Sequence, residues 1–291
     1  MTAEKAPAQG PGTEGSGTTP PVHPAYEVLR PVTSFAGVVL CHNPGTMELD
    51  GTNTWILRAP GSESCVVVDP GPKGHKKHIA AVAAAGPVET VVITHRHRDH
   101  TGGIDRLAAR TGAPVRAWSR KYCRDAEPLR DREVIEAAGL RITVFHTPGH
   151  TADSISLLVE HGDAENHGSE RAMLTGDTIL GRGTTVLDPG DGGLRDYLHS
   201  LNRLIVEGDD CVLLPGHGPD HPELIPVARF YKAHREDRID QIRDALEHLG
   251  VGPAKAKPMR VVRTVYADVD KKLWPAARMS VRAQLDYLAG N

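Results

Sequence analysis

One short segment, Thr-His-Arg-His-Arg-Asp-His at residues 94–100, holds three histidines and an aspartate directly after an apolar run. Neutral imidazole and carboxylate are the side chains that hold Zn²⁺ and similar divalent metals. In an extended segment His95 and His97 point the same way, because side chains repeat every two residues. Asp99 and His100 follow where the chain turns, so they can face a second point nearby. The segment therefore predicts a site for two metal ions at the end of a buried strand.

Because the chain has 16 histidines, a chance cluster is the competing interpretation. Three more ligand-type residues argue against it: His150, Asp177 and His217 each follow a short apolar run broken by Gly or Pro. Such runs are typical of strands that end in turns. Strand ends that meet at one edge of a sheet bring the residues of their loops together. We therefore expect these three residues to join the first four.

The pattern resembles the metallo-β-lactamase superfamily of binuclear hydrolases. The matching residues are His95, His97, Asp99, His100, His150, Asp177 and His217, with Val-Val-Val-Asp-Pro-Gly at residues 66–71. By this resemblance, one zinc would be held by His95, His97 and His150. The other would be held by Asp99, His100 and His217, with Asp177 bridging the two. Asp69 would brace the metal loop, a role that metal sites commonly need; a simple turn before Pro-Gly is the alternative.

The chain is also similar to the β-lactamase-like protein 2 group within that superfamily, over residues 30–289. The stretches that carry this similarity lie at residues 53–55, 95–103, 146–151, 176–185 and 215–219. The resemblance implies an α+β fold, the αββα sandwich, with a small helical, winged-helix-like appendage at the C-terminus. Periodicity alone indicates only mixed strands and helices.

Strands are expected at residues 38–40, 53–57, 64–69, 88–94, 114–118, 140–146, 154–160, 171–175 and 212–214. Helices are expected at residues 74–85, 104–109, 194–206, 223–249, 259–266 and 272–288. We divide the chain into a disordered tail (1–24), a catalytic domain (25–221) and a helical C-terminal domain (222–291). A full wing is not expected, because the sequence ends soon after Leu288. Residues 231–291 carry 12 Lys and Arg against 8 Asp and Glu, which suits either an anionic polymer or a lid with solvated charges.

Several departures narrow the function within the superfamily. Asp177 stands where the commonest zinc β-lactamases carry Cys, so antibiotic hydrolysis is not favoured. His97 stands where the oxygen-reducing di-iron branch carries a carboxylate, which favours two Zn²⁺, although Mn²⁺ or Fe²⁺ are possible. The 40 residues from Asp177 to His217 are too few for the large inserted domain of the RNA-processing nucleases. Glyoxalase II has similar ligand spacing and is not excluded.

The expected chemistry is hydrolysis by a hydroxide that bridges the metals, with Asp99 as the catalytic residue that orients it. The first hypothesis for the substrate is single-stranded RNA, as the group resemblance implies. The alternative is a thioester, as in glyoxalase II and acyl-carrier or CoA thioesterases, and a third is a non-catalytic binding protein. Arg182, Thr184 and Thr185 directly follow the bridging position and are candidates to contact substrate. His146 is a minor candidate for a catalytic role.

Composition sets the remaining expectations. The formal net charge of −3 excludes a generic nucleic-acid binder. No run of 18 apolar residues predicts a membrane span. The four cysteines form no metal-type pair, and two lie in apolar runs, which suits a reducing cytoplasm. The oligomeric state is left open.

Overall fold

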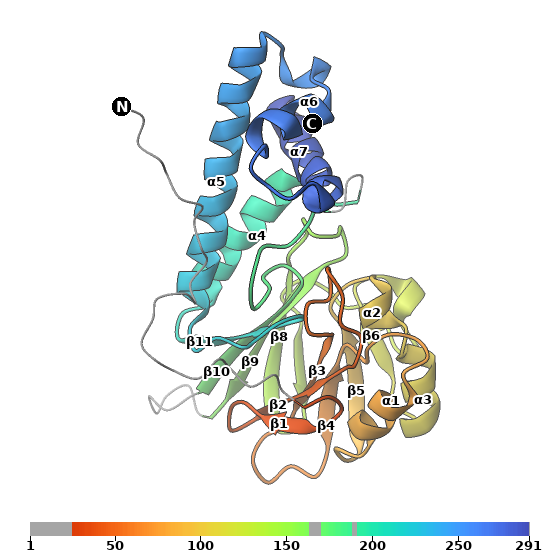
Figure 1. Cartoon of the computed structure of the whole chain (residues 1–291). Helices are drawn as coiled ribbons and strands as arrows, with labels where there is room; N and C mark the ends of the chain where they lie inside the picture. The colour runs from red at the N-terminus through yellow and green to blue at the C-terminus, as the bar shows by residue number, and fades with distance from the viewer. Residues whose placement is uncertain (1–24, 163–169, 188–190, 291) are drawn as a thin grey trace, which may run out of the picture.

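The computed structural model describes residues 25–162, 170–187 and 191–290. The tail predicted at residues 1–24 therefore lies outside the part described. The described chain forms two packed β-sheets with helices on their outer faces, and a group of C-terminal helices stands at one end of this sandwich (Figure 1). The predicted α+β class and αββα sandwich are confirmed.

The first sheet has the strand order β1-β2-β3-β4-β5-β6. Its strands are Leu29–Pro31, Ala36–Leu40, Asn53–Leu57, Cys65–Val68, Val88–Ile93 and Val115–Ala117. Alternation along β4 explains why this sheet lies between two layers. Val66 and Val68 face the second sheet, whereas Cys65 and Val67 face the outer helices. Since successive side chains point to opposite faces, an unbroken apolar run is needed where both faces are covered.

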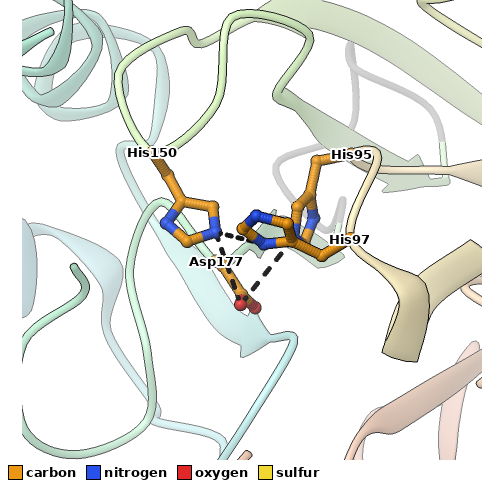
Figure 2. A group of neighbouring side chains, drawn as sticks. All are labelled: His95, His97, His150 and Asp177. Carbon is orange, nitrogen blue, oxygen red and sulfur yellow. Dashed lines mark hydrogen bonds and ion pairs between the residues drawn. The ribbon is translucent and has the colours of Figure 1, made fainter. Parts of the chain in front are cut away.

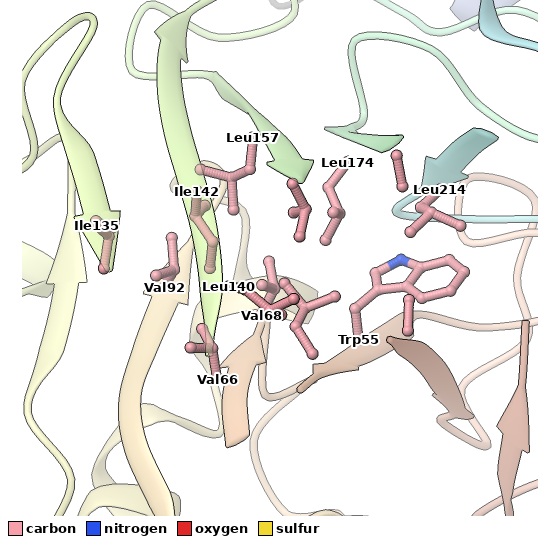
Figure 3. Packing of buried hydrophobic residues seen from close by; sticks show 14 of the residues in the cluster. Trp55, Val66, Val68, Val92, Ile135, Leu140, Ile142, Leu157, Leu174 and Leu214 are labelled. Carbon is pink, nitrogen blue, oxygen red and sulfur yellow. The ribbon is translucent and has the colours of Figure 1, made fainter. Parts of the chain in front are cut away.

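The second sheet has the order β11-β10-β9-β8-β7. Its strands, in the same order, are Cys211–Pro215, Glu170–Gly176, Ile155–His161, Leu140–His146 and Val134–Ala137. Figure 3 shows the apolar layer between the sheets, where Leu140, Ile142 and Leu157 meet Val66 and Val92. Each of these five side chains is at most 1% exposed, so the two sheets bury one continuous core.

Two helices cover each outer face. On the first sheet, α1 (Lys76–Ala83) and α3 (Ile104–Thr111) bury Ile79 and Leu107 against the strands. On the second, α4 (Leu194–Glu207) and the first part of α5 (Leu224–Leu249) bury Leu201 and Tyr231. Each helix places its apolar side chains on one face, as an amphipathic helix on a sheet must.

The C-terminal helices have an apolar cluster of their own. The second part of α5 packs with α6 (Pro258–Val265) and α7 (Trp274–Leu288) through Ile242, Val262 and Val281. α5 thus contributes to two clusters, one beneath the sheet and one at the appendage. Within residues 191–290 no strand follows β11. The division at residue 222 stays a prediction.

The predicted helices and strands agree with the structure to within a few residues at their ends, and β9 and β10 pair as the expected hairpin. The edge strands β1 and β7 and the short helix α2 (Arg98–Thr101) were not expected. β7 joins β8 through Ala138 and Gly139, with φ angles of 51° and 72°. Two successive positive φ angles define a type I′ hairpin turn, for which Asn-Gly is the usual signal. Alanine in the first position hides the hairpin from a reading of the sequence.

Strand direction brings the metal-type residues to one edge. β4, β5 and β6 are parallel, as are β10 and β11, and β8 runs with β10 because both are antiparallel to β9. The loops after β4, β5, β8, β10 and β11 therefore leave the sandwich at the same edge. Trp55 of β3 holds the two sheets together there, because its Nε1 donates to the Pro215 carbonyl at 3.0 Å. Asn53 donates to the same carbonyl from its Nδ2 atom.

In the part of the chain that the structure covers, none of the helices combines the length and apolar character needed to span a membrane.

One close contact of the fold generates a prediction about stability. Gly149 has φ 138°, and a Cβ atom there would overlap the backbone of Tyr197 in α4. Gly149→Ala must therefore displace α4 or the loop that carries His150, and we expect it to lower the free energy of unfolding by about 2–4 kcal/mol. Gly112→Ala is the matched control, because Gly112 has φ 71° and open space around it. The control should cost only about 1–2 kcal/mol. Urea denaturation of the metal-free proteins measures both, and equal losses would contradict the packing argument.

Candidate metal centre

All seven predicted ligand residues lie together at the edge where the strands end. His95 follows β5, His97 precedes α2, and Asp99 and His100 lie within α2. His150, Asp177 and His217 follow β8, β10 and β11. Short loops after buried strands fix these positions, since the backbone before each loop is held in a sheet.

The first ligand group consists of His95, His97, His150 and Asp177 (Figure 2). The Nδ1 atom of His97 lies 3.1 Å from Nε2 of His95 and 3.0 Å from Nε2 of His150. Asp177 approaches from below, with Oδ2 at 3.8 Å from His95 Nε2 and 3.7 Å from His150 Nε2. Three ring nitrogens and a carboxylate oxygen thus point at one small space.

The second group consists of Asp99, His100 and His217. The Nε2 atoms of His100 and His217 lie 3.2 Å apart, and each lies 3.1 Å from Oδ2 of Asp99. Asp177 reaches this group too, with Oδ1 at 3.5 Å from His100 Nε2 and Oδ2 at 3.3 Å from His217 Nε2. Asp177 is therefore shared between the two groups, in the place where a bridging carboxylate would lie.

Asp69 lies behind both groups and supports them. Its Oδ2 accepts hydrogen bonds from Nδ1 of His100 at 2.7 Å and from the Thr94 hydroxyl at 2.6 Å. Nδ1 of His95 lies 3.0 Å from that same hydroxyl, which is free to accept because its proton goes to Asp69. The Asp69 Oδ1 atom accepts from the Thr94 amide at 2.8 Å. Both carboxylate oxygens are thus engaged, so Asp69 suits the predicted brace rather than a further ligand.

The outer ring nitrogens of His150 and His217 meet backbone carbonyls. Nδ1 of His150 donates to the Val186 carbonyl at 2.7 Å, and Nδ1 of His217 donates to the Gly51 carbonyl at 3.0 Å. In a neutral imidazole one nitrogen carries the proton and the other accepts. When such an imidazole is neutral, these contacts place its proton on the outer nitrogen and leave the inner one for a metal ion.

The charges of the two groups differ. Burial lowers the pKa of His150 to about 4 and the pKa of His95 well below its ordinary value, so both imidazoles are neutral. Burial also lowers the pKa of His217, but the carboxylates of Asp177 and Asp99 outweigh it and raise the value to about 10. Burial raises the pKa of Asp177, yet the imidazoles of His217 and His100 hold it well below its usual range. The buried carboxylates therefore stay ionised and call for positive charge beside them.

This donor set fits divalent metal ions. Among the residues described, the buried Oδ1 atom of Asp177 has no hydrogen-bond partner. Bare ring nitrogens about 3 Å apart repel one another unless a cation lies between them. Imidazole and carboxylate ligands suit Zn²⁺ in particular.

The residues predicted to contact substrate have other partners. The Arg182 side chain pairs with Asp50, with Nη2 at 2.8 Å from Oδ1, and Thr184 is half-buried. Thr185 is 3% exposed, and its hydroxyl lies 3.0 Å from Nδ1 of His150. This loop supports a ligand from behind, and its role in contacting substrate remains a prediction.

His146 stacks on Trp118 at a ring distance of 3.9 Å. Its Nε2 atom donates to the Ala152 carbonyl at 2.8 Å, so both the ring face and the ring edge have protein partners. These contacts favour a structural role for His146 over a catalytic one.

Sequence reasoning missed three supporting residues. Thr94 links His95 to Asp69, Thr52 lies 3.4 Å from Asp99 through its hydroxyl, and Val186 receives His150. Thr52 and Thr94 each adjoin a motif that the sequence singled out, so their position was a usable signal. Val186 acts through its backbone carbonyl, for which a side chain gives no signal.

Comparison with known proteins agrees with this geometry. The family model described as metallo-beta-lactamase superfamily matches residues 47–217, and the model described as beta-lactamase associated winged helix domain matches residues 258–289. The C-terminal match agrees with the predicted appendage, here present as helices. Together the matches cover strands β3 to β11 and the helices α6 and α7.

Relatives cover most of the chain. A protein of Drosophila melanogaster named beta-lactamase-like protein 2 homolog is 30% identical over 281 residues, which are 90% of this chain and 89% of that protein. An atrochrysone carboxyl ACP thioesterase of Aspergillus chevalieri is 29% identical over 260 residues, 86% of this chain and 80% of the relative. A crystal structure of a beta-lactamase domain protein from Burkholderia ambifaria superposes with a TM-score of 0.70 at 20% identity, covering 92% of this chain and 90% of that one.

The fold, the match over more than half of the sequence and the similarity to curated relatives lead to one conclusion. The chain belongs to the metallo-β-lactamase superfamily of hydrolases.

Proposed function

We propose that this hydrolase works with two Zn²⁺ ions, one in each ligand group. The observation that carries the proposal is Asp177, whose carboxylate lies within 3.8 Å of ring nitrogens from both groups. When bound, two such ions lower the pKa of a shared water and polarise the bond under attack. The bridging position of Asp177 and the outer hydrogen bonds of the histidines would hold both ions in fixed places.

Asp99 is the residue of the centre best placed to act on the reacting groups. Its side chain is 20% exposed, against 10% for Asp177, so it reaches the open side of the site. Its neighbours His100 and His217 outweigh burial and hold its pKa well below the usual range, so it is ionised. An ionised carboxylate accepts a proton or a hydrogen bond, and Asp99 would orient the attacking water in this way.

The substrate class that we favour is a thioester. Support comes from the name of the Aspergillus chevalieri relative, an acyl-carrier-protein thioesterase, whose similarity extends over most of both chains. Arg96 and Arg182 near the ligand loops pair with Asp191 and Asp50, at 2.6 Å and 2.8 Å. Their positive charge is balanced locally, which suits the uncharged thioester group of a substrate better than a polyanionic backbone.

Cleavage of single-stranded RNA is the second candidate. It rests on the resemblance to the β-lactamase-like protein 2 group and on the excess of Lys and Arg in residues 231–291. A cytoplasmic location is likewise a proposal. Its support is the four free cysteines, of which Cys41, Cys65 and Cys211 are buried.

Elemental analysis of the purified protein should find about two zinc ions per chain, and a chelator should remove activity that zinc restores.

His97→Ala should lose zinc from the first group, because it removes one of three imidazoles there. Asp99→Asn should lower kcat by at least about 100-fold. Asp105→Asn is the matched control, since Asp105 is an exposed aspartate in the first turn of α3. A fully active protein without bound metal would contradict the proposal.

Direct assays can separate the thioester from the single-stranded RNA substrate. Acyl-glutathione, acyl-CoA and acyl-carrier-protein thioesters would be compared with labelled single-stranded RNA, using wild type and Asp99→Asn. We expect kcat/KM to be measurable for at least one thioester and to vanish in the variant. Hydrolysis of RNA alone, absent in Asp99→Asn, would reject the thioester and select the second candidate.

A further inference from the structure

The residues after Asp177 form a loop (178–187) that α4 and α5 hold from outside the metal centre. The Tyr197 hydroxyl of α4 donates to the Thr178 carbonyl at 2.7 Å. The Tyr231 hydroxyl of α5 accepts from the Leu180 amide at 2.9 Å. Both tyrosines are at most 1% exposed, so the start of this loop is tied to the helices through buried hydrogen bonds.

Arg235 of α5 makes the third attachment. One of its guanidinium nitrogens, Nη2, donates to the Thr185 carbonyl, and the guanidinium lies 5.2 Å from the centre of the Tyr197 ring. Arg235 is 3% exposed, and its Nε atom has no partner in the part of the chain described. Nor does any described carboxylate form an ion pair with it. Burial of an unpaired charge costs several kcal/mol, so stability alone does not explain why an arginine is here.

The backbone that Arg235 holds leads to a ligand of the first group. The carbonyl of the next residue, Val186, accepts the hydrogen bond from Nδ1 of His150 at 2.7 Å. The Thr185 hydroxyl lies 3.0 Å from that same nitrogen. Arg235 thus holds the residue next to Val186, and the Val186 carbonyl decides which nitrogen of His150 carries the proton.

Among the described residues, the side-chain hydrogen bonds of the second ligand group do not lead to Arg235. His217 donates from Nδ1 to the Gly51 carbonyl, and His100 donates from Nδ1 to Asp69. Both acceptors lie on the side of the first sheet, before β3 and after β4. A change at Arg235 should therefore reach one group and spare the other.

We propose that Arg235 is a positioning residue for the metal centre: it fixes the Thr185–Val186 backbone from α5 and thereby the tautomer and orientation of His150. The inference rests on the proposed metal-binding function and deepens it. Because α5 also packs with the C-terminal helices, the Arg235 contact couples that appendage to the first ligand group.

The test is zinc affinity of the metal-free full-length protein, measured in two steps by competition with a chromophoric chelator. Arg235→Met should lower the affinity for one of the two zinc ions by about tenfold and leave the affinity for the other unchanged. Arg235→Lys, which keeps the charge and one donor, should recover part of the loss. Arg243→Met is the matched control, since Arg243 is an exposed arginine of the same helix that pairs with Asp240. The control should bind both ions as wild type does.

Two further readouts distinguish positioning from general support of the fold. The melting temperature of metal-free Arg235→Met should equal or exceed that of wild type, because an unpaired buried charge is removed. In a His150→Ala background, Arg235→Met should have no further effect on zinc affinity, since its route passes through His150.

Wild-type affinity for both ions in Arg235→Met would overturn the inference, as would equal weakening of both ions together with a lower melting temperature. An additive loss in the His150→Ala background would overturn it too. If Arg235→Met does not fold, Arg235→Lys is judged by the same criteria. A wild-type protein that binds no zinc would overturn the proposed function along with this inference, whereas the other outcomes leave the proposed function intact.

Discussion

The arrangement of the centre depends on the hydrogen bonds that the Asp69 carboxylate accepts. It accepts from His100 directly and reaches His95 through Thr94, so a single side chain orients one ligand of each group. Asp69 has φ 56°, a conformation that costs free energy for a residue other than glycine. Its peptide carbonyl accepts a hydrogen bond from Thr54, whose hydroxyl also meets Nε2 of His78. This buried chain holds the strained backbone in place, and the strained backbone in turn aims the carboxylate at the metal loop.

Sequence patterns predicted the centre well where strand periodicity governs direction. The apolar run before His95 is buried on both faces, so its end is a fixed point from which His95 and His97 project together. His150, Asp177 and His217 follow the same rule at the ends of β8, β10 and β11. Beyond these ends periodicity stops. The loop after Asp177 is irregular. Its sequence does not predict that Thr185 turns inward to His150 or that Arg182 turns outward to Asp50.

Arg235 shows a second limit of reading the sequence. It lies in the charged run His-Arg-Glu-Asp-Arg at residues 234–238, which on its own is typical of a solvated helix face. The helix period places it above Tyr231, on the side that packs on the second sheet. Its burial is decided by the 178–187 loop, which lies more than 45 residues earlier in the chain. A contact of this kind depends on tertiary packing, and the edge strand β7 was hidden in a similar way by Ala138, whose positive φ only the folded hairpin sustains.

The residues around the ligand groups bear on which substrate a hydrolase of this superfamily accepts. Under the proposed function the two ligand groups supply a general means of activating water, with Asp177 buried between them and Asp99 partly exposed. Selectivity among substrates would then come from the residues around the two ligand groups. There Arg96 pairs with Asp191, and Arg182 pairs with Asp50. A polyanion at the metals would have to compete with those carboxylates for each arginine, at a cost in free energy that the uncharged thioester group does not meet. Under the proposed function, these ion pairs would disfavour long anionic substrates, while α5 would link the C-terminal helices to the first ligand group through Arg235.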